Sequence, residues 1–150
     1  MNTETTASSP QKILVVDDNV IIQQTVALAL SKAHYKVTIA VDITEALGAI
    51  RREVPDLMLL DISFPHDTAG VCGPPRDGIF VIQWFQRMPE VERIPIIVIS
   101  WSDPLKFKDQ ISPQGIIAWF KKPLKHDELL KTIQAALAKR PANQPSVPTP

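Results

Sequence analysis

KILVVDDN, residues 12–19, is a short aliphatic run that ends on two adjacent aspartates and an asparagine. Its four central positions are apolar without polar alternation, which is typical of a strand buried on both faces of a sheet. Apolar residues then recur at helical spacing from Ile22 to Ala33. The segment therefore predicts a buried strand that leads through Asp17 and Asp18 into a helix.

The same alternation of strand and helix continues along the chain. Asp42, with Glu45 three residues later, forms a capping-box signal for the second helix. Parallel strands that are buried on both faces and joined by right-handed helical crossovers form a doubly wound α/β fold. We therefore predict five parallel strands, at 13–16, 35–40, 57–60, 96–99 and 116–120, and five helices. The first helix contains residues 22–33, the next three begin near residues 42, 77 and 102, and the fifth contains residues 129–137.

The composition is that of one globular domain. The 150 residues carry 16 basic and 16 acidic side chains, so no net charge favours nucleic acid or an acidic membrane, and we expect neither as a direct partner. A single cysteine excludes an intrachain disulfide, and no apolar run is long enough to span a bilayer. Because the first residues lack a signal-peptide pattern, we expect a cytoplasmic location.

The two ends of the chain differ from the rest. Residues 1–10 are small and polar, and residues 141–150, PANQPSVPTP, include four prolines and no charge. Such segments bury too little apolar area to offset the entropy lost on ordering. We expect disordered tails at 1–10 and 141–150 on either side of a folded domain at 11–140.

Polar residues follow the predicted strands, where ligands bind in doubly wound folds. Three carboxylates gathered at this edge would repel one another and need a cation, and Mg²⁺ is usually held by carboxylates together with phosphate oxygens. A lysine there would neutralise a phosphoryl group as a point charge. The residues concerned are Asp17, Asp18, Asp61, Ser100 and Lys122.

Each of these features alone has an ordinary structural explanation. Adjacent aspartates or a serine after a strand often cap the next helix, and Lys-Lys-Pro is often an exposed turn. The combination, in this order and on these elements, is far more specific than any single part.

The chain resembles the response-regulator receiver family over about residues 12–138. The resemblance is carried by KILVVDDN at 12–19, LMLLDISFP at 57–65, DG at 77–78, IIVISWS at 96–102 and WFKKPL at 119–124. It implies a flavodoxin-like sheet with strand order 2-1-3-4-5.

The resemblance also implies roles for individual residues. Asp61 would be the phosphoacceptor. Mg²⁺ would be held by Asp17, Asp18 and Asp61 and by the backbone carbonyl of Ser63.

Further roles follow from the same resemblance. Ser100 and Lys122 would bind the phosphoryl group, and Trp119 stands where the family has its switch aromatic. Ser63 and Ser102 occupy the positions that tune the lifetime of the phosphorylated state. A core aromatic is the alternative for Trp119.

As a member of this family, the chain would accept a phosphoryl group from a phosphohistidine of a sensor histidine kinase or His-containing phosphotransfer protein. It would not be an enzyme acting on other substrates, and would assist only its own phosphorylation and dephosphorylation. Phosphorylation would shift the packing of the face formed by strand four, helix four, strand five and helix five, which binds a downstream protein. Receivers often form homodimers through these elements, and the sequence leaves that open.

Three features depart from the family pattern. One is the fourth predicted helix, which is short because Pro113 and Gly115 interrupt it, so the face that binds a downstream protein could be altered. Fifteen residues, 62–76, separate Asp61 from Asp77, which is more than the family usually has. We interpret this segment as a lid, a partner contact or a tolerated insertion. Trp101 follows Ser100 where a small residue is usual. Its indole either narrows access to the site or packs away from it under the long segment.

Three other functions remain to be weighed against a stand-alone switch. The chain could be a receiver-like module that no longer switches, although the retained acidic residues and lysine oppose this. It could also be the receiver fragment of a longer regulator. A phosphatase of the haloacid dehalogenase type would need a second aspartate two residues after Asp17, where this chain has Asn19.

Overall fold

The computed structural model describes residues 10–62, 82–83, 85–101, 109 and 115–138. Five parallel strands form one sheet in the order β2-β1-β3-β4-β5, as predicted. The elements are, in chain order, β1 (Lys12–Val16), α1 (Val20–Lys32), β2 (Lys36–Ala40), α2 (Ile43–Arg52), β3 (Leu57–Asp61), β4 (Ile96–Ser100), β5 (Ile116–Lys121) and α4 (His126–Ala138).

Burial follows the position of each strand in the sheet. Every residue of β3 and β4 is buried, as are four of the five residues of β1. The edge strands β2 and β5 are only partly covered. The three central strands therefore contain the uninterrupted apolar runs, as expected when both faces of a parallel sheet are covered.

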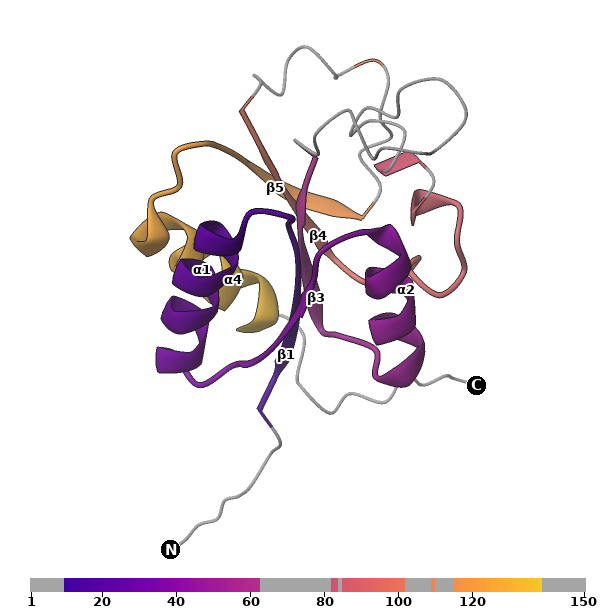
Figure 1. The fold of residues 1–150 in the computed structure, drawn as a ribbon, viewed down its shortest axis with the longest axis horizontal. Coiled ribbons are helices and arrows are strands. Elements are labelled where there is room, and N and C mark those ends of the chain that lie inside the picture. Colours follow the sequence, from indigo (N-terminus) through magenta and orange to yellow (C-terminus); the bar gives the residue numbers. More distant parts are fainter. Residues whose placement is uncertain (1–9, 63–81, 84, 102–108, 110–114, 139–150) are drawn as a thin grey trace, which may run out of the picture.

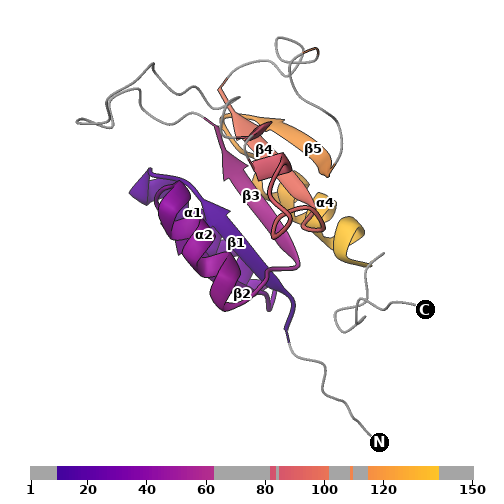
Figure 2. The same cartoon turned by 90° about the vertical axis from the view of Figure 1, so that its right-hand side faces the viewer.

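Helices cover both faces of the sheet, with α1 and α4 on one side and α2 on the other (Figure 1). Successive strand residues alternate between two buried clusters. Ile13, Val15, Leu57, Leu59, Ile97 and Ile99 pack with α1 and α4, whereas Leu14, Val16, Met58, Leu60, Ile96 and Val98 pack with α2, Ile82 and Phe85. This arrangement confirms the doubly wound fold, and the view in Figure 2 shows β3 and β4 in the middle of the sheet.

Side-chain caps fix where the first two helices begin. The Asn19 side chain accepts a hydrogen bond from Ile22 N at 3.1 Å, so the residue after the two aspartates starts α1. Asp42 accepts from Glu45 N at 2.8 Å, and the Glu45 carboxylate accepts from Val41 N at 3.0 Å. The predicted cap of α2 is thereby confirmed.

The remaining predictions about the fold fall partly outside the described residues. Residues 82–83 and 85–86 are helical, in agreement with the third predicted helix, but its start at Asp77 is not described. Most of the fourth predicted helix, residues 63–76, residues 1–9 and the tail at 141–150 also lie outside the described residues. None of the described helices is long and apolar enough to cross a bilayer.

Candidate functional site

The carboxyl ends of β1 and β3 lie side by side at one edge of the sheet. Val16 pairs with Leu60 in the strand register, so Asp17 and Asp61 come next at the same level. One carboxylate oxygen from each of Asp17, Asp18 and Asp61 lies within 4.8 Å of the others. We call these three residues the acidic cluster. The parallel topology has thus brought together carboxylates that are more than forty positions apart in the sequence.

Asp17 is the most constrained member of the acidic cluster. It is 1% exposed, and its Oδ1 accepts a hydrogen bond from Asn19 N at 2.8 Å. Its backbone carbonyl accepts a hydrogen bond from the Gln23 side chain. Its other carboxylate oxygen, Oδ2, is buried and has no hydrogen-bond partner within the described part of the chain. An orphaned buried oxygen beside two more carboxylates fits a divalent cation with oxygen ligands such as Mg²⁺.

Burial changes the acidity of this cluster. It raises the pKa of Asp17 from its usual 3.8 to about 7, with a further contribution from the negative charge of Asp61. Burial and the same neighbour also raise the pKa of Asp18. Both shifts show that, without a cation, the site holds its negative charge at an energetic cost.

This cost predicts how the metal-free protein responds to pH. Because the folded-state pKa of Asp17 lies above its usual value, the folded protein keeps a proton that the unfolded chain has lost between about pH 4 and pH 7. The stabilisation due to Asp17 is therefore complete below this window and lost as the pH rises through 7. Asp17→Asn should flatten this slope and raise the free energy of unfolding at pH 8 by roughly 1–3 kcal/mol, measured by urea denaturation in EDTA.

Asp127→Asn is a suitable control, because Asp127 is exposed at the start of α4. The free energy of unfolding of Asp127→Asn should depend on pH as that of the wild type does. An Asp17→Asn protein with an unchanged pH profile would contradict the assignment of the raised pKa.

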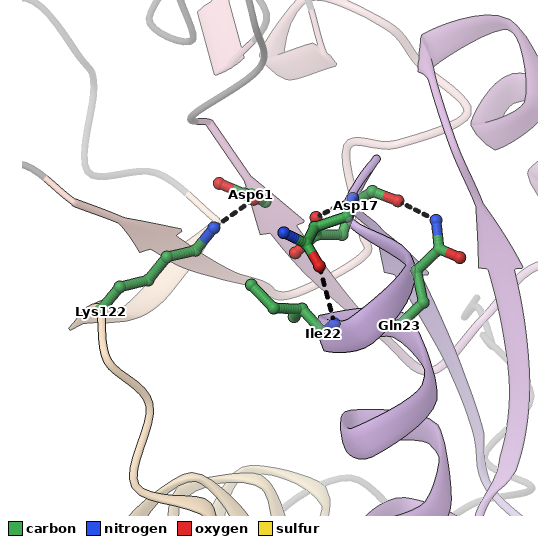
Figure 3. A network of polar contacts seen from close by, with 6 residues as sticks. Asp17, Ile22, Gln23, Asp61 and Lys122 are labelled. Carbon is green, nitrogen blue, oxygen red and sulfur yellow. Dashed lines mark hydrogen bonds and ion pairs between the residues drawn. The ribbon is translucent and has the colours of Figure 1, made fainter.

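Lys122 supplies the positive charge of the site. Its backbone N donates to Ser100 O at 2.8 Å, which fixes the residue just beyond β5, and the Lys122–Pro123 bond is cis. Its Nζ lies 2.6 Å from Asp61 Oδ2, and both side chains are almost fully buried. Figure 3 shows Lys122 reaching Asp61 from the β5 side while Asp17 lies on the β1 side. One ammonium group against three carboxylates leaves the site negative, which again favours a bound cation.

Of the other predicted site residues, the structure describes Ser100 and Trp119. Ser100 is buried at the end of β4, at the same edge of the sheet. Trp119 is half-buried on β5 and packs against the buried cluster on the α2 face. Ser63 and Ser102 lie outside the described residues, so their predicted roles stay predictions.

Two contacts at the site were not anticipated from the sequence. Gln23 is buried on the first turn of α1 and holds the Asp17 carbonyl. Nothing in the local sequence distinguishes Gln23 from the neighbouring Gln24, which is exposed. Trp101 places its ring 5.6 Å from Lys122 Nζ, so it does not pack away from the site.

A doubly wound sheet with an acidic cluster and a buried lysine at its carboxyl edge defines a receiver-like domain of the flavodoxin-like class. The family model for the response regulator receiver domain matches residues 13–134, within the predicted domain at 11–140. The chain therefore belongs to the response regulator receiver family.

Known proteins of this family resemble the chain over most of its length. It is 29% identical over 127 residues to protein PilH of Pseudomonas aeruginosa, which covers 85% of this chain and 98% of PilH. It spans about half the length of several other curated response regulators. A similar solved structure is that of the chemotaxis protein CheY4 of Vibrio cholerae, with a TM-score of 0.71, 26% identity and coverage of 85% of this chain and 99% of that one.

A magnesium-bound neighbour is also similar in fold. The receiver domain of the sensor histidine kinase PA1611 from Pseudomonas aeruginosa has a TM-score of 0.68 and 24% identity, with coverage of 86% of this chain and 98% of that one. It is described with a magnesium ion coordinated in its active site cleft. Receiver domains generally bind Mg²⁺.

Proposed function

We propose that this protein is a single-domain phosphorylation switch in which Asp61 accepts a phosphoryl group. The observation that carries the proposal is the contact of 2.6 Å between Lys122 Nζ and Asp61 Oδ2 inside the acidic cluster. Phosphoryl transfer to a carboxylate needs a lone pair on the attacking oxygen and a nearby cation that stabilises the negative charge of the phosphoryl group. Asp61 supplies the first and Lys122 the second.

The phosphoryl donor is a phosphohistidine on a sensor histidine kinase or a His-containing phosphotransfer protein. An Asp61 carboxylate oxygen forms the new bond to phosphorus while the phosphorus–nitrogen bond of the donor breaks. The imidazole leaves with the bonding electron pair and takes up a proton. Water later hydrolyses the acyl phosphate and restores the Asp61 carboxylate. The protein assists only these two steps on itself and acts on no other substrate.

Mg²⁺ would be held by Asp17, Asp18 and Asp61 together with the backbone carbonyl of Ser63, a ligand taken from the sequence resemblance. The orphaned Asp17 Oδ2 and the surplus of negative charge support this assignment. When bound, the ion neutralises charge on the transferring phosphoryl group. Two hydrogen bonds keep Asp17 oriented. The Gln23 side chain donates to its backbone carbonyl, and the Asn19 backbone N donates to its Oδ1.

Phosphorylation of Asp61 changes the conformation of the domain through Ser100, Lys122 and Trp119. Ser100 and Lys122 bind the phosphoryl oxygens. This binding changes the packing of the face formed by β4, the fourth predicted helix, β5 and α4. A downstream protein binds that face in the phosphorylated state. We place this exchange in the cytoplasm, where kinase phosphohistidines are formed.

The test is intact-mass spectrometry after incubation with a small phosphodonor such as acetyl phosphate. With Mg²⁺, the protein should gain the mass of one phosphoryl group, and peptide mapping after borohydride reduction should place it on Asp61. With EDTA in place of Mg²⁺, the gain should disappear. A protein that gains no mass but still binds partners would be a non-switching interaction module instead.

A further inference from the structure

Trp101 occupies an unusual position beside the acceptor site. It follows Ser100 directly at the carboxyl end of β4, and the residue is 60% exposed. Its ring centroid lies 5.6 Å from Lys122 Nζ, within the range in which an ammonium group is attracted to an aromatic face. The large exposed indole is therefore not simply a surface residue, because it contacts the buried ammonium group of Lys122.

The same ammonium group contacts both the indole and the acceptor. Lys122 Nζ lies 2.6 Å from Asp61 Oδ2, and the lysine side chain is only 4% exposed. The negative face of an indole stabilises a cation at a fixed place, and tryptophan does so better than phenylalanine. An aliphatic side chain of similar size would cover the lysine without this attraction.

We infer that Trp101 is a positioning residue of the phosphoryl-transfer site, whose indole face holds the Lys122 ammonium against Asp61. The inference deepens the proposed function and rests on it for its kinetic consequence. Lys122 must bridge the acceptor carboxylate and an arriving phosphoryl oxygen, so a lysine held in place avoids ordering its long side chain during transfer. Trp101 itself touches neither phosphorus nor metal in this scheme.

The contact can be measured without any phosphorylation. In the 150-residue chain, the protons on Lys122 Cε should show an upfield ring-current shift in ¹H–¹³C NMR spectra, and their resonances are assigned by their loss in Lys122→Arg. The shift should vanish in Trp101→Leu and persist in part in Trp101→Phe. A Lys122 resonance that is the same in wild type and Trp101→Leu would overturn the inference.

The kinetic consequence is measured with a small phosphodonor, so that partner docking plays no part. With saturating Mg²⁺, Trp101→Leu should lower the maximal rate of Asp61 phosphorylation about five-fold, while Trp101→Phe recovers part of the loss. Ile117→Ala, a truncation of an exposed apolar residue on β5, is the control and should match wild type. Equal losses in the leucine and phenylalanine variants would show that size matters rather than the aromatic face, and would overturn the inference.

The two failures are distinguishable. If the wild-type protein gains no phosphoryl group, the proposed function fails, and the NMR shift still decides whether the indole holds the ammonium. If wild type is phosphorylated and Trp101→Leu reacts at the same rate, the function stands and the positioning role is wrong.

Discussion

Asp61→Asn should abolish the Mg²⁺-dependent phosphoryl adduct. An amide has no nucleophilic carboxylate oxygen, so no acyl phosphate can form at this position. Loss of a catalytic nucleophile lowers rates by more than about a thousand-fold, which places the residual signal at background. The measurement is intact-mass spectrometry with acetyl phosphate and Mg²⁺ over a time course, beside wild type.

Asp56→Asn provides a matched control at the other end of β3. Asp56 lies just before β3, at the opposite end from Asp61, and its carboxylate accepts a hydrogen bond from Lys12 N at 2.8 Å. Asparagine retains an oxygen for that bond, so this variant should phosphorylate like wild type. An adduct that persists in Asp61→Asn and maps to Asp17 or Asp18 would reject Asp61 as the acceptor.

Lys122→Met should destabilise the metal-free protein by about 3–5 kcal/mol at pH 8, because it leaves the Asp61 carboxylate buried without its cation. The ion pair joins two side chains that are 4% and 2% exposed, so water cannot replace the ammonium group without entering the site. Saturating Mg²⁺ should recover part of the loss, since a divalent cation neutralises the same carboxylates. Urea denaturation in EDTA and in Mg²⁺ measures both effects.

Lys121→Met separates the role of the site from a general loss of positive charge. Lys121 is the adjacent residue at the end of β5 and is exposed. Its replacement should change the free energy of unfolding by no more than about 0.5 kcal/mol. Equal destabilisation by the two variants would mean that the buried ion pair contributes nothing specific.

Most of the architecture could be predicted from local sequence. The apolar runs of β1, β3 and β4 lack alternation because both faces of the sheet are covered, and the structure confirms this with two buried clusters on opposite sides. The Asp42 cap of α2 could also be predicted from the sequence, because a capping box is formed by residues only three positions apart. The strand order came from the family resemblance instead, because strand patterns alone do not specify which strands are neighbours.

The candidate site was predictable in its members but not in its contacts. Asp17, Asp18, Asp61, Ser100 and Lys122 could be chosen because each follows a predicted strand, and parallel strands end at one edge. Gln23 was missed, since nothing in its local sequence shows that it turns inward to the Asp17 carbonyl. The contact of Trp101 with Lys122 joins residues that directly follow two neighbouring strands, β4 and β5, and only the pairing of these strands places the ring near the ammonium group.

Local sequence was enough to predict the secondary structure pattern, the covered faces of the sheet and the identity of the polar residues at its edge. These properties depend on the periodicity and chemistry of neighbouring residues, which act over a few positions. Three properties became visible only in the folded structure: which carboxylate oxygen has no hydrogen-bond partner among the described residues, which carboxylate is paired with Lys122, and how strongly burial raises the pKa of Asp17. Those properties depend on distances and desolvation between segments remote in the chain, and both arise only when the sheet has assembled.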